Sequence, residues 1–273
     1  MPNLLLQDIT TFFVVIDDSL EKRSITGRSP ILSGSEGVTI LLWCSFVLCI
    51  KTLRGIYDFV RRYHRREFPR LPDYSAFVRC CHKVSSLLLS FLQKSLGDNE
   101  SFIRFVDFTM LPVCTTVRAD SHRVAKGIAA FGKNHQGWHY GFKLHATVKR
   151  KGYLCGISLT PTNIHDAQAV PNICDENAKI LVGDGGYSAS VMREALWREK
   201  GVFLLAPPHP KQRKKILSSW QHFLLQMRPK VESMFDTLKE HMHLVTSFPR
   251  SVMGYLLHYL RILVGYQFKS AFC

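Results

Sequence analysis

The fold is decided by the stretch FIRFVD at residues 102–107 and by the strand-like runs that follow it. Residues 140–148 (YGFKLHATV) and 153–159 (YLCGISL) are also short apolar runs bounded by turn residues. The turn KRKG at residues 149–152 joins these two runs, which predicts a β-hairpin. We therefore expect three consecutive strands, the first of them at residues 102–106.

Downstream of the hairpin, strands alternate with helices. Short buried strands are predicted at residues 179–182 and 202–206, and helices at residues 166–176 and 188–200. The polar segment from Pro207 to Arg228 leads into further helices. The order β-β-β-α-β-α-β predicts an α/β fold in which helices cover a mixed sheet.

The N-terminal region, residues 1–98, is predicted to be all-helical. Ser33 and Glu36 have the spacing of a capping box ahead of an apolar helix at residues 38–50. Residues 52–67 carry apolar side chains at helical spacing, and arginines occupy much of the remaining surface. We expect two domains, a helical region at 1–98 and an α/β domain at 99–273. The arginines of the predicted helix are Arg54, Arg61, Arg62, Arg65 and Arg66.

Composition excludes several classes of protein. The 273 residues are 46% hydrophobic, which rules out a disordered chain, and their net charge of +15 favours a polyanionic partner such as nucleic acid. The longest apolar run, residues 38–50, is shorter than the roughly 20 residues of a membrane-spanning helix. Acidic residues bracket the first apolar stretch, so we expect no cleaved signal and a cytosolic protein. The eight cysteines, which form no CxxC pair, are expected to be reduced core residues.

Two aspartates are expected at strand ends, where α/β sheets commonly bind ligands. Asp107 follows the first predicted strand, and Asp184 follows the strand at residues 179–182 and precedes two glycines. An aspartate that only forms a turn is the alternative for each. A third acid, Glu232, falls in the first turn of a predicted helix that starts with Arg228 and Pro229. Favourable placement of an acid near a helix N-terminus would also explain Glu232.

Taken together, these residues resemble the DDE transposases of bacterial insertion sequences. Asp107, Asp184 and Glu232 match the acidic triad of those enzymes, and Arg228-x3-Glu232-x6-Lys239 is similar to the Tyr-x2-Arg-x3-Glu-x6-Lys signature of one large group. Further blocks follow the family's pattern in order along nearly the whole chain. They are LSGSEGVTI (32–40), RGIYDFVRR (54–62), VDFTMLPVC (106–114), GWHYGFKLH (137–145), LTPTNIHD (159–166) and VGDGGYS (182–188).

The resemblance implies a ribonuclease-H-like catalytic domain at residues 99–273 and a DNA-binding helical region at residues 1–98. It implies two Mg²⁺ ions, replaceable by Mn²⁺, with Asp107 bridging both and Asp184 and Glu232 each holding one. Arg228 and Lys239 would position phosphates. The partners implied are double-stranded DNA, as element ends and target, and further copies of the chain, with no membrane. The protein would act in the bacterial cytoplasm, at the nucleoid. The helical region would contact DNA through Arg61, Arg62, Arg65 and Arg66.

Two positions depart from the group's pattern and leave other functions open. Leu225 stands at the tyrosine of the signature, and Gly185 stands after Asp184 where this group commonly has lysine. One alternative is therefore a DNA-binding protein of the same origin that has lost catalysis. Another is a structure-specific nuclease on the same fold. A zinc site is a weaker alternative, because His135-x3-His139 has ligand spacing only on a helix and a strand is expected there.

Overall fold

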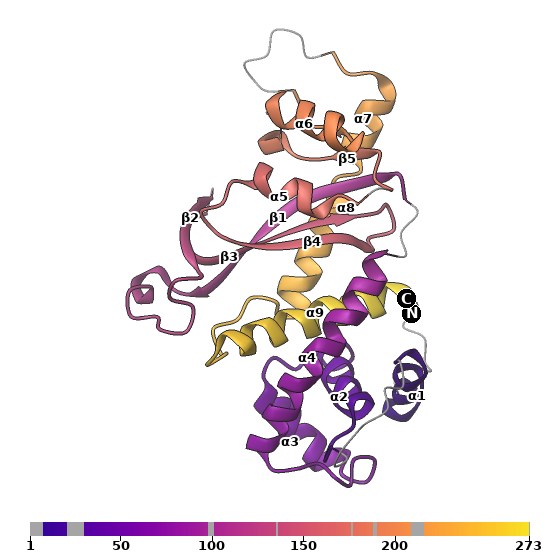
Figure 1. Cartoon of the computed structure of the whole chain (residues 1–273), viewed down its shortest axis with the longest axis vertical. Coiled ribbons are helices and arrows are strands. Elements are labelled where there is room, and N and C mark those ends of the chain that lie inside the picture. The colour runs from indigo at the N-terminus through magenta and orange to yellow at the C-terminus, as the bar shows by residue number, and fades with distance from the viewer. Residues whose placement is uncertain are drawn as a thin grey trace. The chain divides into compact units, whose positions relative to one another are not determined.

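The computed structural model describes residues 8–20, 30–97, 101–134, 136–175, 177–187, 190–208 and 216–272 (Figure 1). The chain divides into two compact units. The first unit comprises Met1–Lys94, Leu238–Leu244 and Phe248–Cys273, and the second comprises Ser95–Thr237 and Val245–Ser247. No helix within the described ranges is long and apolar enough to cross a membrane.

The first unit is helical, as predicted. Its capping box is confirmed, because the Ser33 hydroxyl accepts from the Glu36 amide while the Ser33 amide donates to the Glu36 carboxylate at 2.7 Å. Residues 37–45 of α2 are all buried, since apolar side chains surround this part of the helix and α1 and α9 pack against α2. The helices of this unit are α1 (Ile9–Ser19), α2 (Gly34–Phe46), α3 (Leu53–Tyr63), α4 (Tyr74–Gly97) and α9 (Val252–Phe272).

Two helices end earlier than expected. The apolar run at residues 38–50 leaves the helix after Phe46, and Cys49 has a positive φ of 52°. The buried guanidinium of Arg261 fixes this turn, donating to the carbonyls of Ile50 at 3.1 Å and Lys51 at 2.6 Å. The second helix, α3, ends at Tyr63 rather than residue 67, so Arg65 and Arg66 lie in the turn beyond it.

The C-terminal helix belongs to the first unit, which differs from the expected division into residues 1–98 and 99–273. Helix α9 is buried along Tyr255–Tyr266 apart from Leu256, so it needs apolar surface on several sides. Helix α2 supplies such a surface and packs against it. The start of the second unit, at Ser95, lies close to the predicted boundary.

The second unit contains a mixed six-stranded sheet. Its main strand order is β2-β3-β1-β5-β6, and β4 also pairs with β3. β3 is antiparallel to β1, β2 and β4, whereas β1, β5 and β6 are parallel to one another. The strands are β1 (Ile103–Cys114), β2 (Ala130–Asn134), β3 (Gly137–Val148), β4 (Leu154–Pro161), β5 (Ile180–Val182) and β6 (Phe203–Leu205).

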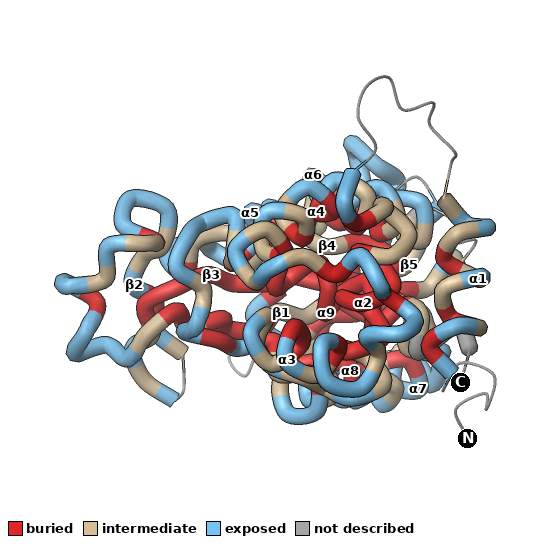
Figure 2. The backbone as a smooth tube through the Cα atoms, turned by 90° about the horizontal axis from the view of Figure 1, so that it is seen from below, coloured by how far each residue is buried: buried red, intermediate tan, exposed pale blue. Residues whose placement is uncertain are grey.

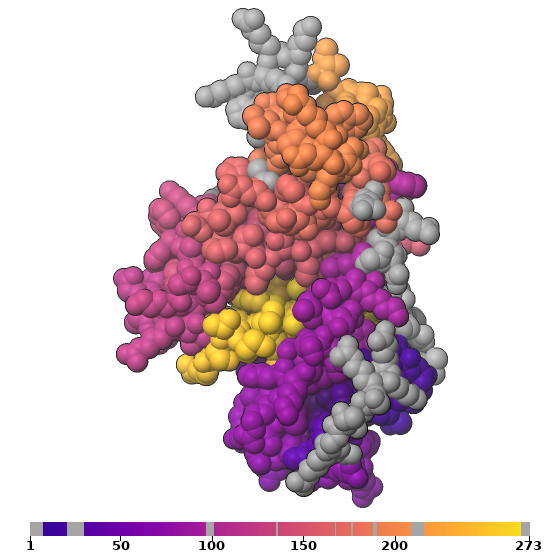
Figure 3. All heavy atoms as spheres, in the orientation of Figure 1, coloured from indigo at the N-terminus to yellow at the C-terminus, as the bar shows by residue number. Residues whose placement is uncertain are grey.

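Helices cover this sheet, as the predicted α/β fold class requires. Buried residues line β3 from Tyr140 to Val148 (Figure 2). A core of apolar side chains joins β1, β5, α5 and α6. Met192 and Leu196 of α6 are buried in it, and the other side of this helix lies at the surface of the second unit (Figure 3). The helices are α5 (Asp166–Ile173), α6 (Ser190–Lys200), α7 (Ser219–Gln226) and α8 (Pro229–Asp236), with short turns η2 (Thr116–Arg118), η3 (Gly185–Tyr187) and η4 (Thr237–His241).

The cysteines agree only partly with the expected core positions. The seven cysteines within the described ranges are unpaired. Cys44, Cys81, Cys155 and Cys174 are buried, and burial raises the pKa of the Cys174 thiol to about 11. Cys49, Cys80 and Cys114 are half-buried instead, because they lie in a turn, on the outer side of α4 and at the end of β1.

Candidate functional site

Strand register brings Asp107 and Asp184 to matching positions. β1 and β5 run parallel, and their last paired residues are Phe105 and Val182. Asp107 and Asp184 each lie two residues beyond that pair, so they fall at the same edge of the sheet. The expectation that the strand ends before Asp107 is wrong, because β1 continues to Cys114 through its pairing with β3. The pairing of β1 with β5 does end before Asp107, after the pair of Phe105 and Val182. Beyond this pair, β5 no longer covers the edge of β1.

Asp107 lies in an environment that disfavours its charge. The side chain is half-buried, and its Oδ1 accepts a hydrogen bond of 2.8 Å from the Phe108 amide. Burial, together with the smaller effects of the Asp184 and Glu232 carboxylates, raises the pKa of Asp107 to about 6, against the lowering effects of the Phe108 amide and Arg228. Asp107 therefore interacts electrostatically with both Asp184 and Glu232.

Asp184 is held by the turn that follows β5. Its Oδ1 accepts from the Gly186 amide at 2.8 Å, and its carbonyl accepts from the Tyr187 amide at 3.1 Å. Gly183 allows this turn to close, because a Cβ there would lie 2.8 Å from Cδ2 of Tyr187. At Gly185, by contrast, a Cβ would meet no atom within 4 Å, so the turn itself does not require glycine at this position.

Glu232 reaches the site from α8. The predicted helix start is confirmed, with Arg228 at the N-cap, Pro229 at the first position and Glu232 in the first turn. Buried Val231, Met234 and Phe235 anchor α8, which contacts β1. Glu232 itself is exposed, and its Oε1 lies 3.4 Å from Nη2 of Arg228. Arg228 thus accompanies Glu232 and also acts electrostatically on Asp107.

The donor set suits a hard divalent cation in its chemistry. Three carboxylates offer the oxygen ligands that Mg²⁺ prefers, and their mutual repulsion would be relieved by a cation. Within the described ranges, however, no group of three acidic, histidine or cysteine side chains lies close enough to enclose an ion. The acids of this site are therefore electrostatic neighbours that would have to draw together on an ion.

The other predicted DNA-contacting residues belong to the first unit. Lys239 lies in the π-helical turn η4, beyond α8. Arg61, Arg62 and Arg66, called the arginine trio below, are exposed at the end of α3 and in the turn after it. Arg65 is exposed too, but its guanidinium donates to the Leu71 carbonyl at 2.5 Å, which gives it a structural contact.

The zinc alternative finds no support in the described part of the chain. His135 lies outside the described residues. His139 lies on β3 rather than on a helix, with its Nε2 2.9 Å from Oδ1 of Asn134. A spacing of four residues brings two histidines to the same side of a helix, but His139 lies on a strand, so this argument for a zinc site does not apply.

Sequence reasoning missed two buried polar side chains of the second unit. Lys143 on β3 is buried and donates to Asp166 at 2.8 Å and to the Ile164 carbonyl at 2.9 Å. Tyr187 is fully buried, and its hydroxyl lacks a hydrogen-bond partner in the described structure. Both residues lie in blocks that the sequence singles out, GWHYGFKLH and VGDGGYS, but a linear pattern does not show which of their side chains are buried.

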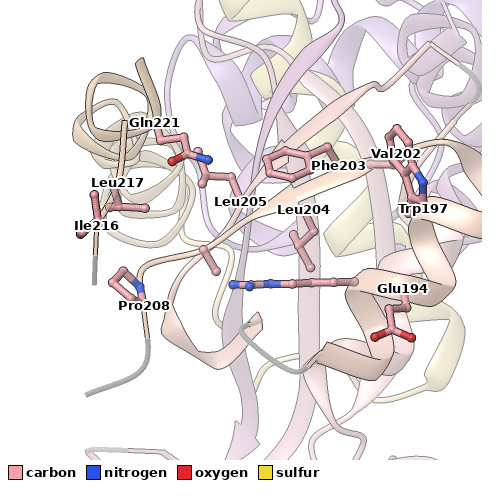
Figure 4. A pocket seen from close by; sticks show the side chains of 12 residues that line it. Glu194, Trp197, Val202, Phe203, Leu204, Leu205, Pro208, Ile216, Leu217 and Gln221 are labelled. Carbon is pink, nitrogen blue, oxygen red and sulfur yellow. The ribbon is translucent and has the colours of Figure 1, made fainter. Parts of the chain in front are cut away.

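A separate pocket of about 570 Å³ lies beside β6 and contains none of the three candidate acids. Figure 4 shows Phe203, Leu204 and Leu205 of β6 between Trp197 and Glu194 of α6 on one side and Gln221 and Leu217 on the other. Trp197 and Phe203 are among its exposed aromatic residues.

Comparison with known proteins identifies the family. A family model described as transposase DDE domain matches residues 97–252, a range that includes Asp107, Asp184 and Glu232. Neither a search of curated proteins nor one of solved structures gives a significant match. The family match agrees with the ribonuclease-H-like fold class that the sequence predicts. Because it covers more than half of the 273 residues, the chain belongs to the family of transposases with a DDE domain.

Proposed function

We propose that the chain is an insertion-sequence transposase that cuts DNA at the ends of its element and joins the freed strands to target DNA. The observation that carries the proposal is the electrostatic interaction of Asp107 with Asp184 and Glu232, near the end of β5. Neighbouring carboxylates disfavour one another's ionised form, and a bound cation relieves this repulsion. Such an arrangement is typical of sites that bind cations.

In this proposal Asp107, Asp184 and Glu232 hold two Mg²⁺ ions, replaceable by Mn²⁺. When bound, such ions would supply activation of water and stabilisation of the leaving oxygen in phosphoryl transfer. Asp107, on which both other acids act electrostatically, would serve both ions. Asp184 is held in place by its turn and Glu232 by the anchored α8, so each would present a carboxylate to one ion.

Two cations would position the DNA backbone at this site. Arg228 lies 3.4 Å from Glu232, so its guanidinium can contact a phosphate beside the acids. Lys239, in η4 of the first unit, would also bind a DNA phosphate. Neither contact reads base sequence.

The helical first unit would bind double-stranded DNA through the arginine trio, with Arg65 contributing charge beside its structural contact. The net charge of +15 favours attraction to phosphates over the whole chain. Holding two element ends together requires more than one copy, so we infer a homo-oligomer on DNA. A protein with this substrate would work at the nucleoid, in the bacterial cytoplasm.

The test is cleavage and joining by the purified chain on DNA that carries its gene with native flanks, in Mg²⁺ or Mn²⁺. We expect metal-dependent cuts at the flanks that disappear in Asp184→Ala and Glu232→Gln, while DNA binding persists. Asp236→Asn, an exposed acid on the same helix as Glu232, is the matched control and should cut normally.

Other results would refute the proposal in distinguishable ways. Cutting that survives in Asp184→Ala would remove this residue from the site. Binding without cutting in either metal would indicate a DNA-binding protein that has lost catalysis. Cutting that ignores the element ends and never joins strands would indicate a structure-specific nuclease.

A further inference from the structure

Tyr187 combines complete burial with an unsatisfied hydroxyl. It is 0% exposed and belongs to the core that joins β1, β5, α5 and α6. Its hydroxyl oxygen has no hydrogen-bond partner in the part of the chain that the structure describes. A phenylalanine would avoid the desolvation cost of such a group, so the hydroxyl calls for a reason other than packing.

Close packing fixes the position of the Tyr187 ring. A Cβ added at Gly183 would lie 2.8 Å from Cδ2 and 3.1 Å from Cγ of Tyr187, and 3.1 Å from Cγ1 of Val106. The ring therefore lies against the bare backbone of Gly183 and beside Val106, the residue before Asp107. With the ring fixed at two sides, the position of the hydroxyl is fixed as well.

Three carboxylates act on this hydroxyl. Burial raises the pKa of Tyr187, and the charges of Asp107, Asp166 and Asp184 raise it further, so the group is a neutral donor at working pH. Asp107 has the largest effect of the three. Asp166 already accepts from Lys143, whereas in Asp107 the amide of Phe108 occupies only Oδ1 and leaves Oδ2 as an acceptor.

We propose that Tyr187 is a positioning residue of the acid site, whose hydroxyl donates a hydrogen bond to the Asp107 carboxylate when the three acids draw together on an ion. The bond would orient one oxygen of Asp107 toward Asp184 and Glu232. Catalytic hydrogen bonds are commonly long in unliganded proteins and tighten in the loaded state. This inference rests on the proposed function and adds a residue to its site.

The experiment compares Tyr187→Phe with Tyr259→Phe in the full chain. Tyr259 is the matched control, because it is also buried with an unpartnered hydroxyl but lies on α9, in the first unit. Mn²⁺ binding is measured by electron paramagnetic resonance, and folding by thermal unfolding. We expect about tenfold weaker Mn²⁺ binding in Tyr187→Phe alone, the effect of one hydrogen bond to a charged group. Neither variant should unfold at a lower temperature than wild type.

Wild-type Mn²⁺ affinity in Tyr187→Phe, or equal weakening in both variants, would overturn the proposal. If Asp107→Asn binds Mn²⁺ with wild-type affinity, Asp107 is not a metal ligand and the proposed function fails. A metal-free measurement then tests Tyr187 separately. In protein labelled with ¹³Cζ-tyrosine, the Tyr187 signal is identified by its loss in Tyr187→Phe. It should move in Asp107→Asn and stay in Asp236→Asn. A signal that stays in both variants would show that the Asp107 carboxylate does not act on the Tyr187 hydroxyl, and would overturn the proposal.

Discussion

The Asp107→Asn substitution should stabilise the metal-free second unit at neutral pH. Asparagine keeps the shape of the side chain and an oxygen that can accept from the Phe108 amide, but it carries no charge. The pKa of Asp107 rises from an ordinary 3.8 to about 6, chiefly through burial. At about 1.4 kcal/mol per pKa unit, this difference corresponds to about 3 kcal/mol of unfolding free energy.

The sign follows from proton binding. Because the folded protein holds the Asp107 proton more tightly than the unfolded chain, wild-type stability falls as pH rises from about 4 to about 6 and is level above that range. The stability of Asp107→Asn does not fall in this way, because asparagine has no proton to release. The two proteins should therefore be similar near pH 4, and the variant should be more stable by up to about 3 kcal/mol at pH 7.

Amide hydrogen exchange of β1 in EDTA measures this difference, because it reports opening of the second unit without requiring both units to unfold together. Rates are corrected for the intrinsic pH dependence of exchange. Adding Mg²⁺ at pH 7 should then slow exchange in wild type more than in the variant, since an ion bound to the acids stabilises the folded state. A stability difference that is the same at pH 4 and pH 7 would refute the raised pKa of Asp107.

Three further substitutions test other parts of the structure. Gly183→Ala should destabilise the second unit by about 1–3 kcal/mol, because the new Cβ clashes with the Tyr187 ring. Gly185→Ala has open space at its Cβ and should leave the urea midpoint unchanged. Equal effects of the two substitutions would contradict the packing described. Arg261→Met should cost roughly 2–5 kcal/mol, because it strands two carbonyls of the turn before α3, and thermal unfolding should show no such loss for the exposed Arg250→Met. Replacing the arginine trio by alanine should lower the slope of log affinity for DNA against log salt by up to about 3, at nearly one counterion per lost phosphate contact. An unchanged slope would exclude these residues from the DNA interface.

The sequence predicts most of the elements, because local signals decide them. The capping box at Ser33 and Glu36, the KRKG hairpin turn and the proline after Arg228 each act within a few residues and appear where expected. The second unit's sheet follows from short apolar runs separated by turns. What the sequence misplaces are ends, such as those of α3 and β1, which depend on tertiary partners like the Leu71 carbonyl and β3.

The sequence predicts which acids form the candidate site, but it does not predict the burial and the contacts of the side chains around them. The spacing of Asp107, Asp184 and Glu232 indicates which acids to compare, and the register of β1 with β5 brings two of them to matching positions. The burial of Tyr187 and the contact between Lys143 and Asp166 depend on side-chain packing across four elements, which no linear pattern records. The assignment of α9 to the first unit likewise depends on a partner helix more than 200 residues away in sequence.

The return of α9 to the first unit makes the sheet-containing unit an insertion within a helical one. Helices α2 and α9 belong to the same helical unit, so a fragment that stops at residue 98 would expose the apolar faces of α2 that α9 covers. A DNA-binding fragment should therefore be made by joining residue 94 to residue 238 through a short linker, with α9 retained. The same connectivity means that a chain cut just before α9 should lose the packing of the helical unit while the sheet that carries Asp107 and Asp184 keeps all of its strands.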